Sequence, residues 1–196
     1  MKFLLGILAG FAILGLVGAV WVLSGSFDVA ARAPIGKFEK QFAGFALDRA
    51  VARRAPKVSN PLAPSKEVLS GGLEHFGEMC VTCHGAPGVE PSEIGVGLNP
   101  PAPDLTLAKV QARSDGELFW FVSNGVRMSG MPAFGPTHKE NELWQIVAFL
   151  RHLPALTPEE EKQLQAGASE HEHGEEHAPG KESGHTHEGE HAPETH

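Results

Sequence analysis

The only two cysteines of this 196-residue chain lie two residues apart in the segment CVTCH, residues 80–84, and a histidine directly follows the second one. Three kinds of site use a Cys-x-x-Cys pair: a redox-active dithiol, half of a zinc site, and the attachment point of a c-type haem. A thioredoxin-type dithiol opens a helix after a strand, but no apolar strand run flanks this segment. A structural zinc site needs a second ligand pair about 12 to 20 residues further on. The next histidine after His84 is His138, so the haem interpretation is favoured.

The haem interpretation gives each residue of the motif a role. The thiols of Cys80 and Cys83 would add to the vinyl groups of the porphyrin, and the imidazole of His84 would lie beneath the iron as its proximal ligand. Because both cysteines would be thioethers, the cysteine content says nothing about the redox compartment. The motif therefore predicts one covalently bound haem c.

A second ligand for the iron is expected downstream. A methionine thioether opposite the histidine gives the His/Met ligation of electron-carrying cytochromes. The Gly- and Pro-rich segment NGVRMSGMPAFGP contains Met128 and Met131. Since Pro132 biases the residue before it to an extended conformation, Met131 would project from a stiff loop. We predict Met131 as the distal ligand, with Met128 as the alternative and a core-filling role for either side chain as the other reading.

Two segments carry the pattern of a helix start. SDGE at 114–117 and THKE at 137–140 read as capping boxes, which predict helices beginning near residues 115 and 138. The first is followed by an apolar cluster of Leu118, Phe119, Phe121 and Val122. In the second helix the apolar residues have the spacing of a buried stripe: Leu143, Ile146, Val147 and Leu150. In a domain of about 90 residues the burial of apolar surface is marginal without a cofactor, so the porphyrin would form much of the core.

Residues 66–155 resemble the class I monohaem c-type cytochromes, in the bacterial membrane-anchored subgroup whose methionine loop ends in GMPAFG. Gly72 and Phe76 stand where that family places a glycine and an aromatic residue on its first helix. The first helix crosses the last one, for which ENELWQIVAFLRHL offers Ile146 and Phe149 as the matching face. The resemblance implies an all-α fold, a small helical domain around one covalent haem.

The resemblance extends to the segment PDL at 103–105, which is similar to the Pro-x-Leu of the family. It implies that the carbonyl of Pro103 accepts a hydrogen bond from the proximal imidazole and that Leu105 touches the porphyrin. A partner of this kind fixes the orientation of a metal-binding histidine. The predicted haem-binding residues are thus Cys80, Cys83, His84, Met131, Pro103 and Leu105, of which His84 and Met131 are the axial ligands.

The N-terminal segment, residues 3–23, is uncharged and overwhelmingly apolar. As a helix it would extend about 31 Å, roughly the hydrocarbon thickness of a bilayer. We predict an N-terminal transmembrane helix that anchors the chain, and a cleaved signal peptide is the alternative. Haem is joined to c-type apoproteins outside the bacterial inner membrane, so the expected location is that membrane, with the haem domain in the periplasm.

A connecting segment, residues 27–64, carries aromatic residues at helical spacing between basic ones. Ile35, Phe38, Phe42 and Phe45 recur every three or four residues. They predict an amphipathic basic helix. Such a helix could lie on membrane lipid, dock on a membrane protein, or pack against the haem domain.

The C-terminal segment, residues 157–196, begins with TPEEE, which predicts a short helix capped by Thr157. Beyond it, a tail with seven of the eleven histidines holds no large apolar residue and is expected to be disordered. Tracts of this composition bind zinc, copper or nickel, and a solvated acidic spacer is the alternative. The candidate ligands are His171, His173, His177, His185, His187 and His191.

We predict that the chain has four parts: an anchor at 1–26, a connecting segment at 27–64, a cytochrome c domain at 65–156 and a tail at 157–196. The distribution of charged residues follows this division. Residues 1–66 hold nine basic and three acidic residues, whereas 67–156 hold five and ten. An acidic exported domain makes nucleic acid an improbable partner.

The predicted function is that of an electron carrier rather than an enzyme. It would exchange electrons with periplasmic or membrane redox proteins, such as a dehydrogenase or a terminal oxidase. Two alternatives remain at this point. One is a haem enzyme or ligand sensor of peroxidase type, in which the iron keeps an open position. The other is a metal-handling protein that acts through its His-rich tail.

Overall fold

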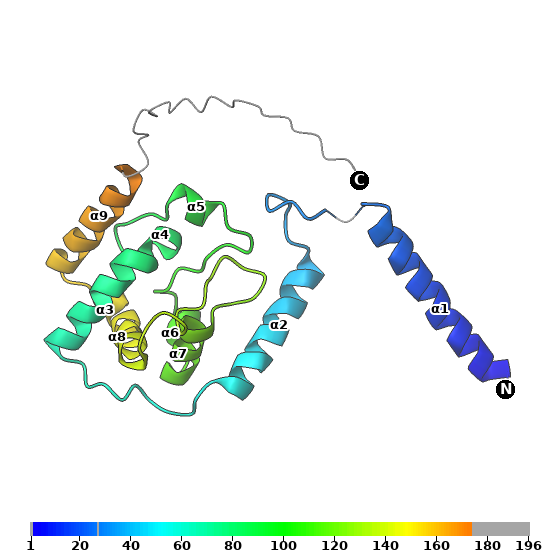
Figure 1. The fold of residues 1–196 in the computed structure, drawn as a ribbon, viewed down its shortest axis with the longest axis horizontal. Helices are drawn as coiled ribbons and strands as arrows, with labels where there is room; N and C mark the ends of the chain where they lie inside the picture. The colour runs from blue at the N-terminus through cyan, green and yellow to red at the C-terminus, as the bar shows by residue number, and fades with distance from the viewer. Residues whose placement is uncertain (1, 27, 174–196) are drawn as a thin grey trace, which may run out of the picture.

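The structure is a computed structural model that describes residues 2–26 and 28–173. Over these residues the chain is helical and contains no β-strand, which confirms the predicted all-α class (Figure 1). The elements are α1 (Lys2–Leu23), α2 (Lys37–Arg54), α3 (Lys66–Met79), α4 (Val81–His84), α5 (Glu93–Val96), α6 (Ala108–Gln111), α7 (Asp115–Asn124), α8 (Glu140–His152), the 3-10 turn η1 (Leu153–Ala155) and α9 (Pro158–His173).

The core is built where α3 crosses α8. Phe76 of α3 and Phe149 of α8 are both fully buried, and their ring centroids lie 5.3 Å apart. Ile146, one turn before Phe149, is also fully buried, so the predicted face of the last helix is confirmed. At Gly72 the two backbones come so close that no side chain would fit. Packing of this kind fixes the angle at which the first and last helices of the domain meet.

The predicted start of α7 is confirmed. Ser114 is its N-cap: the Ser114 hydroxyl accepts a hydrogen bond from the Glu117 N–H at 3.2 Å, and the Ser114 N–H donates to the Glu117 carboxylate at 2.9 Å. Two of the N–H groups that lack a partner within the helix are thereby satisfied, which is the reason the pattern marks a helix start.

The predicted start of α8 is wrong by two residues. The helix begins at Glu140, because the Lys139 N–H donates to the Glu142 carboxylate at 2.8 Å. Thr137 does not cap the helix, since its hydroxyl donates instead to the Phe134 carbonyl at 3.2 Å and its N–H donates to the same oxygen. The Thr137 hydroxyl therefore bonds to the end of the preceding loop, although the sequence pattern predicted that it would cap the helix.

The helix predicted in the connecting segment forms as α2, and it lies along one side of the domain, but its aromatic residues are not the ones that pack (Figure 1). Val51 is fully buried against the domain, and Asp48 forms an ion pair with Arg113 at 2.6 Å. Phe38 and Phe42 are 79% and 63% exposed. The helix therefore has two apolar faces, of which only the one containing Val51 contacts the haem domain.

Helix α9 lies on the other side of the domain, against α3 (Figure 1). The predicted Thr157 cap is confirmed: its hydroxyl accepts from the Glu160 N–H at 3.3 Å, and the Thr157 N–H donates to the Glu160 carboxylate at 2.8 Å. Leu164 is 2% exposed and belongs to the same apolar cluster as Phe76. The helix is therefore part of the packed core, although it lies in the segment predicted as a tail.

Helix α1 stands apart from the rest of the chain in Figure 1, and every residue from 2 to 26 is exposed. Among the helices of the described residues it is the one long and apolar enough to cross a membrane, with a mean hydropathy of 2.5. A signal sequence near an N-terminus has the same length and composition, so this property is a weak indication of an anchor.

Candidate haem site

The segment CVTCH occupies a tight turn at the end of α3. Cys80 is the C-cap of α3, and its N–H donates to the Phe76 carbonyl at 2.9 Å. The next residues turn back as the four-residue helix α4, in which the His84 N–H donates to the Cys80 carbonyl at 2.9 Å. No disulfide joins the two cysteines. The turn thus presents two thiols and one imidazole from five consecutive residues.

The imidazole ring of His84 forms a hydrogen bond with the segment that contains Pro103. Nδ1 of His84 lies 2.8 Å from the Pro103 carbonyl oxygen. A carbonyl only accepts, so Nδ1 carries the proton and Nε2 keeps its lone pair for a metal. Desolvation lowers the pKa of His84, while the hydrogen bond to Pro103 acts in the opposite direction. The net shift favours the neutral imidazole, which is the form that binds iron.

The thiols are not arranged for redox chemistry as a dithiol. Desolvation raises the pKa of Cys80 to about 12, and the neighbouring Cys83 adds to the shift. Reactive cysteines of disulfide oxidoreductases have the opposite property, a lowered pKa that yields a thiolate near neutral pH. The raised pKa of Cys80 therefore gives no support to a redox-active dithiol.

Helix α5 covers the motif at very short range. Ser92, its N-cap, donates from its hydroxyl to the Thr82 carbonyl at 2.9 Å. A Cβ at Gly95 would lie 2.9 Å from the Cα of Cys83, closer than real side chains pack. Position 95 therefore requires glycine. Sequence reasoning missed Ser92 and Gly95, because a lone serine and a lone glycine in a loop carry no motif that could have indicated them.

The loop between α7 and α8 carries the two methionines. Met131 is partly buried, and its backbone is held by hydrogen bonds from the Val126 N–H to the Met131 carbonyl and from the Met131 N–H to the Ser129 hydroxyl, both 3.2 Å. Met128 is 91% exposed and has a positive φ of 60°. The two side chains therefore differ sharply in environment.

The methionine loop and the motif share a neighbour. The backbone of Gly130 is packed against the side chain of Leu98 so tightly that a Cβ at position 130 would overlap it. Leu98 follows α5 directly, and α5 packs on Cys83 through Gly95. The segment 92–98 thereby links the loop of Met131 to the turn of the thiols.

A cavity of about 440 Å³ lies beside His84. Its lining includes His84, Pro91, Leu105 and Leu153, whereas neither thiol nor Met131 contributes to it. Leu105 also packs against the main apolar cluster. The structure thus brings His84, Pro103 and Leu105 together, joins the thiols to His84 through the turn, and places Met131 on a separate loop.

These residues fit a covalently bound haem c. Two thiols at the required spacing precede an imidazole whose Nδ1 is already engaged, and a partly buried thioether lies on a loop linked to the same turn. Among the described residues no group of three or more His, Cys, Asp or Glu side chains could hold another metal ion. The structure describes the backbone of His171 and His173 in α9 but not their side chains, and His177, His185, His187 and His191 lie outside the described residues.

The helical fold around this turn defines the class of the domain as a cytochrome c domain. Comparison with protein-family models agrees, because residues 68–150 match the family described as cytochrome c oxidase, cbb3-type, subunit III. The matched region spans α3 to α8 and makes this part of the chain a class I monohaem c-type cytochrome domain. No curated protein matches the chain.

Proposed function

We propose that the protein is a membrane-tethered, periplasmic electron carrier whose single haem c passes one electron at a time between respiratory redox partners. The cytochrome c domain supports a haem-based electron carrier rather than a catalyst. The observation that carries the residue assignment is the 2.8 Å contact between His84 Nδ1 and the Pro103 carbonyl. This contact leaves the other ring nitrogen for the iron and fixes the plane of the ring.

In this proposal each residue of the candidate haem site has one role. Cys80 and Cys83 would hold the haem through thioether bonds, and His84 and Met131 would bind its iron. The Pro103 carbonyl keeps the proton on Nδ1 of His84, and Leu105 supplies apolar surface. A bound haem supplies the one-electron couple, which His/Met ligation moves to a higher potential.

Met131 is assigned as the distal ligand in preference to Met128. The partly buried position of Met131 and its link through Gly130 and Leu98 to the turn of the thiols support this choice. Met128, at 91% exposure, points its thioether to solvent. A side chain in that environment would have to leave the surface to reach an iron within the domain.

The proposed location is supported by α1 and by the chemistry of haem attachment. An uncleaved α1 in the inner membrane would keep the haem domain in the periplasm and near membrane complexes, which raises its effective concentration there. A dehydrogenase or a terminal oxidase is the expected kind of partner, since the matched family is named for an oxidase subunit. The ten acidic and five basic residues of 67–156 favour a basic or neutral docking face on it.

The test compares Met131→Ala with Met128→Ala in the detergent-solubilised holoprotein. Met131→Ala should abolish the long-wavelength charge-transfer band of a ferric iron–thioether bond. It should also lower the midpoint potential by on the order of 0.1 V or more, within the range that axial ligands span. Met128→Ala should leave both unchanged. A high-spin wild-type spectrum, or a spectrum indifferent to position 131, would contradict His/Met ligation and support a haem enzyme or sensor with an open iron position.

A further inference from the structure

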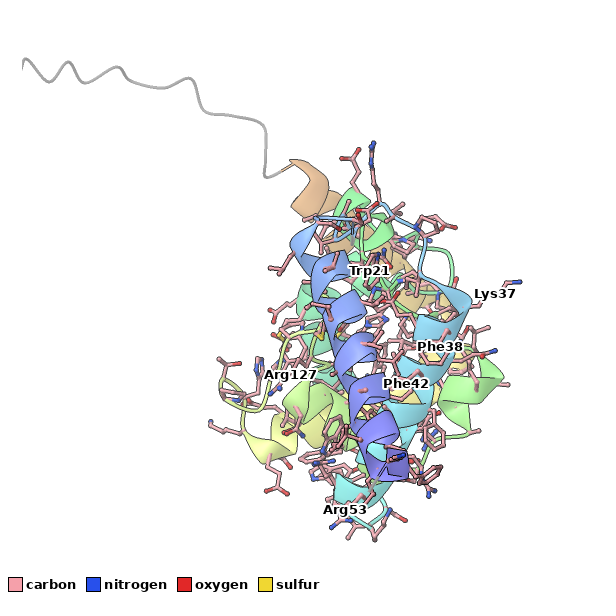
Figure 2. The ribbon with its side chains drawn as sticks, turned by 90° about the vertical axis from the view of Figure 1, so that its right-hand side faces the viewer. Trp21, Lys37, Phe38, Phe42, Arg53 and Arg127 are labelled. Atoms are coloured by element: carbon pink, nitrogen blue, oxygen red, sulfur yellow. The ribbon has the colours of Figure 1, made fainter. Side chains whose placement is uncertain are left out.

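One face of α2 remains uncovered by any described part of the chain. It consists of Phe38, Phe42, Phe45, Arg49 and Arg53, which recur every three or four residues and therefore share one side of the helix. We call this set the aromatic-basic stripe. The three phenylalanines are 79%, 63% and 64% exposed, and both arginines are exposed as well. In Figure 2 the labelled Phe38, Phe42 and Arg53 lie along α2 in the view from the side on which α1 stands.

The stripe is organised by contacts among its own members. The rings of Phe38 and Phe42 stack with centroids 6.0 Å apart, and the guanidinium of Arg49 lies 5.9 Å from the centroid of the Phe45 ring. Within the described residues neither Arg49 nor Arg53 has a carboxylate partner, whereas Arg113 and Arg151 both form ion pairs. The stripe is thus a row of apolar rings that continues into two unneutralised positive charges.

The opposite face of α2 is fixed to the haem domain. Val51 and Ala55 are buried, Asp48 pairs with Arg113 at 2.6 Å, and the Pro56 carbonyl packs directly on Gly116 of α7. A surface that binds the stripe therefore orients the whole haem domain and not a loose helix.

The attachment of the connecting segment limits how far this surface lies from the end of α1. The side-chain amide of Asn99 donates to the carbonyls of Ala31 and Ala33, at 2.6 Å and 2.8 Å. Only residues 24–30 separate the end of α1 from this docked part. Even fully extended, these residues span at most about 25 Å. With α1 in a bilayer, the domain face that contains α2 is held close to the lipid headgroups.

We propose that the aromatic-basic stripe binds the anionic surface of the bilayer that holds α1. This inference rests on the proposed membrane anchor. Phenylalanine rings partition into the boundary between headgroups and acyl chains, while arginines bind lipid phosphates, and a helix that offers both on one face has the chemistry of an interfacial helix. The acidic haem domain is repelled by the same surface, so the charge distribution favours the orientation in which α2 faces the lipid.

The test measures backbone hydrogen exchange of α2 by mass spectrometry, using full-length holoprotein in lipid nanodiscs. One set of discs contains only phosphatidylcholine and the other adds phosphatidylglycerol. Exchange within residues 37–54 should be slower in the anionic discs, whereas exchange in α9 should be the same in both. Each basic residue at an anionic surface changes the binding equilibrium about fivefold, so Arg49→Gln/Arg53→Gln should shift it by about 30-fold.

Matched variants separate lipid binding from general effects of charge or apolarity. Phe38→Ser/Phe42→Ser/Phe45→Ser should remove the protection in both kinds of disc. Lys109→Gln/Lys162→Gln removes two exposed charges elsewhere, and Ile94→Ser/Val96→Ser removes two exposed apolar side chains elsewhere. Both controls should leave the protection of α2 intact.

The outcomes that overturn the proposal are distinct from those that overturn the proposed function. Equal exchange of α2 in both lipids, or protection that survives the stripe variants, contradicts lipid binding. Protection that arises only when a membrane protein co-purifies indicates a protein partner instead. Release of the chain from membranes by alkaline carbonate contradicts the anchor alone. In that case sedimentation of the full chain with phosphatidylglycerol vesicles tests lipid binding by the stripe. A chain that fails to sediment with the vesicles contradicts this binding. Absence of covalent haem contradicts the proposed electron carrier and leaves the proposed lipid binding of the stripe unaffected.

Discussion

Gly72 of α3 lies directly against Phe149 of α8: a Cβ at position 72 would stand 2.6 Å from the Cβ of Phe149 and would overlap the Gln145 carbonyl oxygen. Another glycine of the same helix, Gly77, has a different environment, because a Cβ there would make an ordinary 3.6 Å contact with Leu164. A Cβ at Gly71 would meet only the end of the Gln145 side chain, at 2.9 Å, so the close approach of the two backbones depends on Gly72.

Gly72→Ala is expected to destabilise the holoprotein by about 1–3 kcal/mol, since the added methyl group must push the two backbones apart. Gly77→Ala is the matched control. It should be neutral or stabilising by up to about 1 kcal/mol, because alanine is the better helix former. Thermal unfolding of both purified variants, followed by far-UV circular dichroism, measures the difference. Equal stability of the two would show that the crossing is not sterically limited.

Leu164→Ala is expected to destabilise the haem domain by about 2–5 kcal/mol, the usual cost of truncating a buried leucine. Leu164 is 2% exposed and packs in the same cluster as Phe76, although it lies outside the region matched by the family model. Lys162→Ala, an exposed change in the same helix, should have little effect. Denaturant unfolding monitored at the haem would reveal an unchanged midpoint if α9 were only an appendage.

The stability contributed by Asp115 should depend on pH. Desolvation raises the pKa of Asp115, but hydrogen bonds from the Asn60 N–H and from Arg151, together with the Arg151 charge, outweigh it and hold the pKa below its ordinary value. A carboxyl with a depressed pKa in the folded state stabilises the fold above its unfolded pKa of about 3.9 and loses this contribution as pH falls through the folded value.

Asp115→Asn should therefore cost about 1.5–3 kcal/mol near neutral pH, the range of a hydrogen bond to a charged group, and progressively less below about pH 4. A double-mutant cycle with Arg151→Gln, repeated across this range, isolates the pair, whose nitrogen and oxygen lie 2.8 Å apart. A coupling energy that stayed constant down to pH 2 would contradict the assignment.

Loss of the thiols should prevent folding of the domain rather than merely loosen the cofactor. Cys80→Ser/Cys83→Ser removes covalent attachment, and a ligand bound only by the native state stabilises that state in proportion to its binding free energy. We expect no covalent haem in denatured protein, a large loss of helical circular dichroism and rapid proteolysis of residues 66–155. Retention of native helicity in this variant would show that the apolar core suffices without the porphyrin.

Features of the sequence that depend on neighbouring residues were predicted correctly. The capping box at Ser114 and the cap at Thr157 each involve groups three residues apart. The interactions that form such elements are written in the local sequence. The error at Thr137 shows the limit of this reasoning, because a local pattern can be satisfied in two ways. Here the Phe134 carbonyl of the preceding loop competes successfully for the hydroxyl.

Other features were decided only by contacts between distant parts of the chain. The approach of Gly95 to Cys83 joins neighbouring segments of the haem site, Asn99 ties the loop after α5 to residues 31 and 33, and Leu164 completes the core from a segment read as a tail. The periodicity of α2 predicted one apolar face, yet Val51 packs on the domain while Phe38 and Phe42 face outward. The sequence alone determined the helix starts at Ser114 and Thr157, and it indicated the side chains that we propose hold a haem. Which face each helix buries depends on the shape of the surface that it meets, and that surface exists only once the chain has folded.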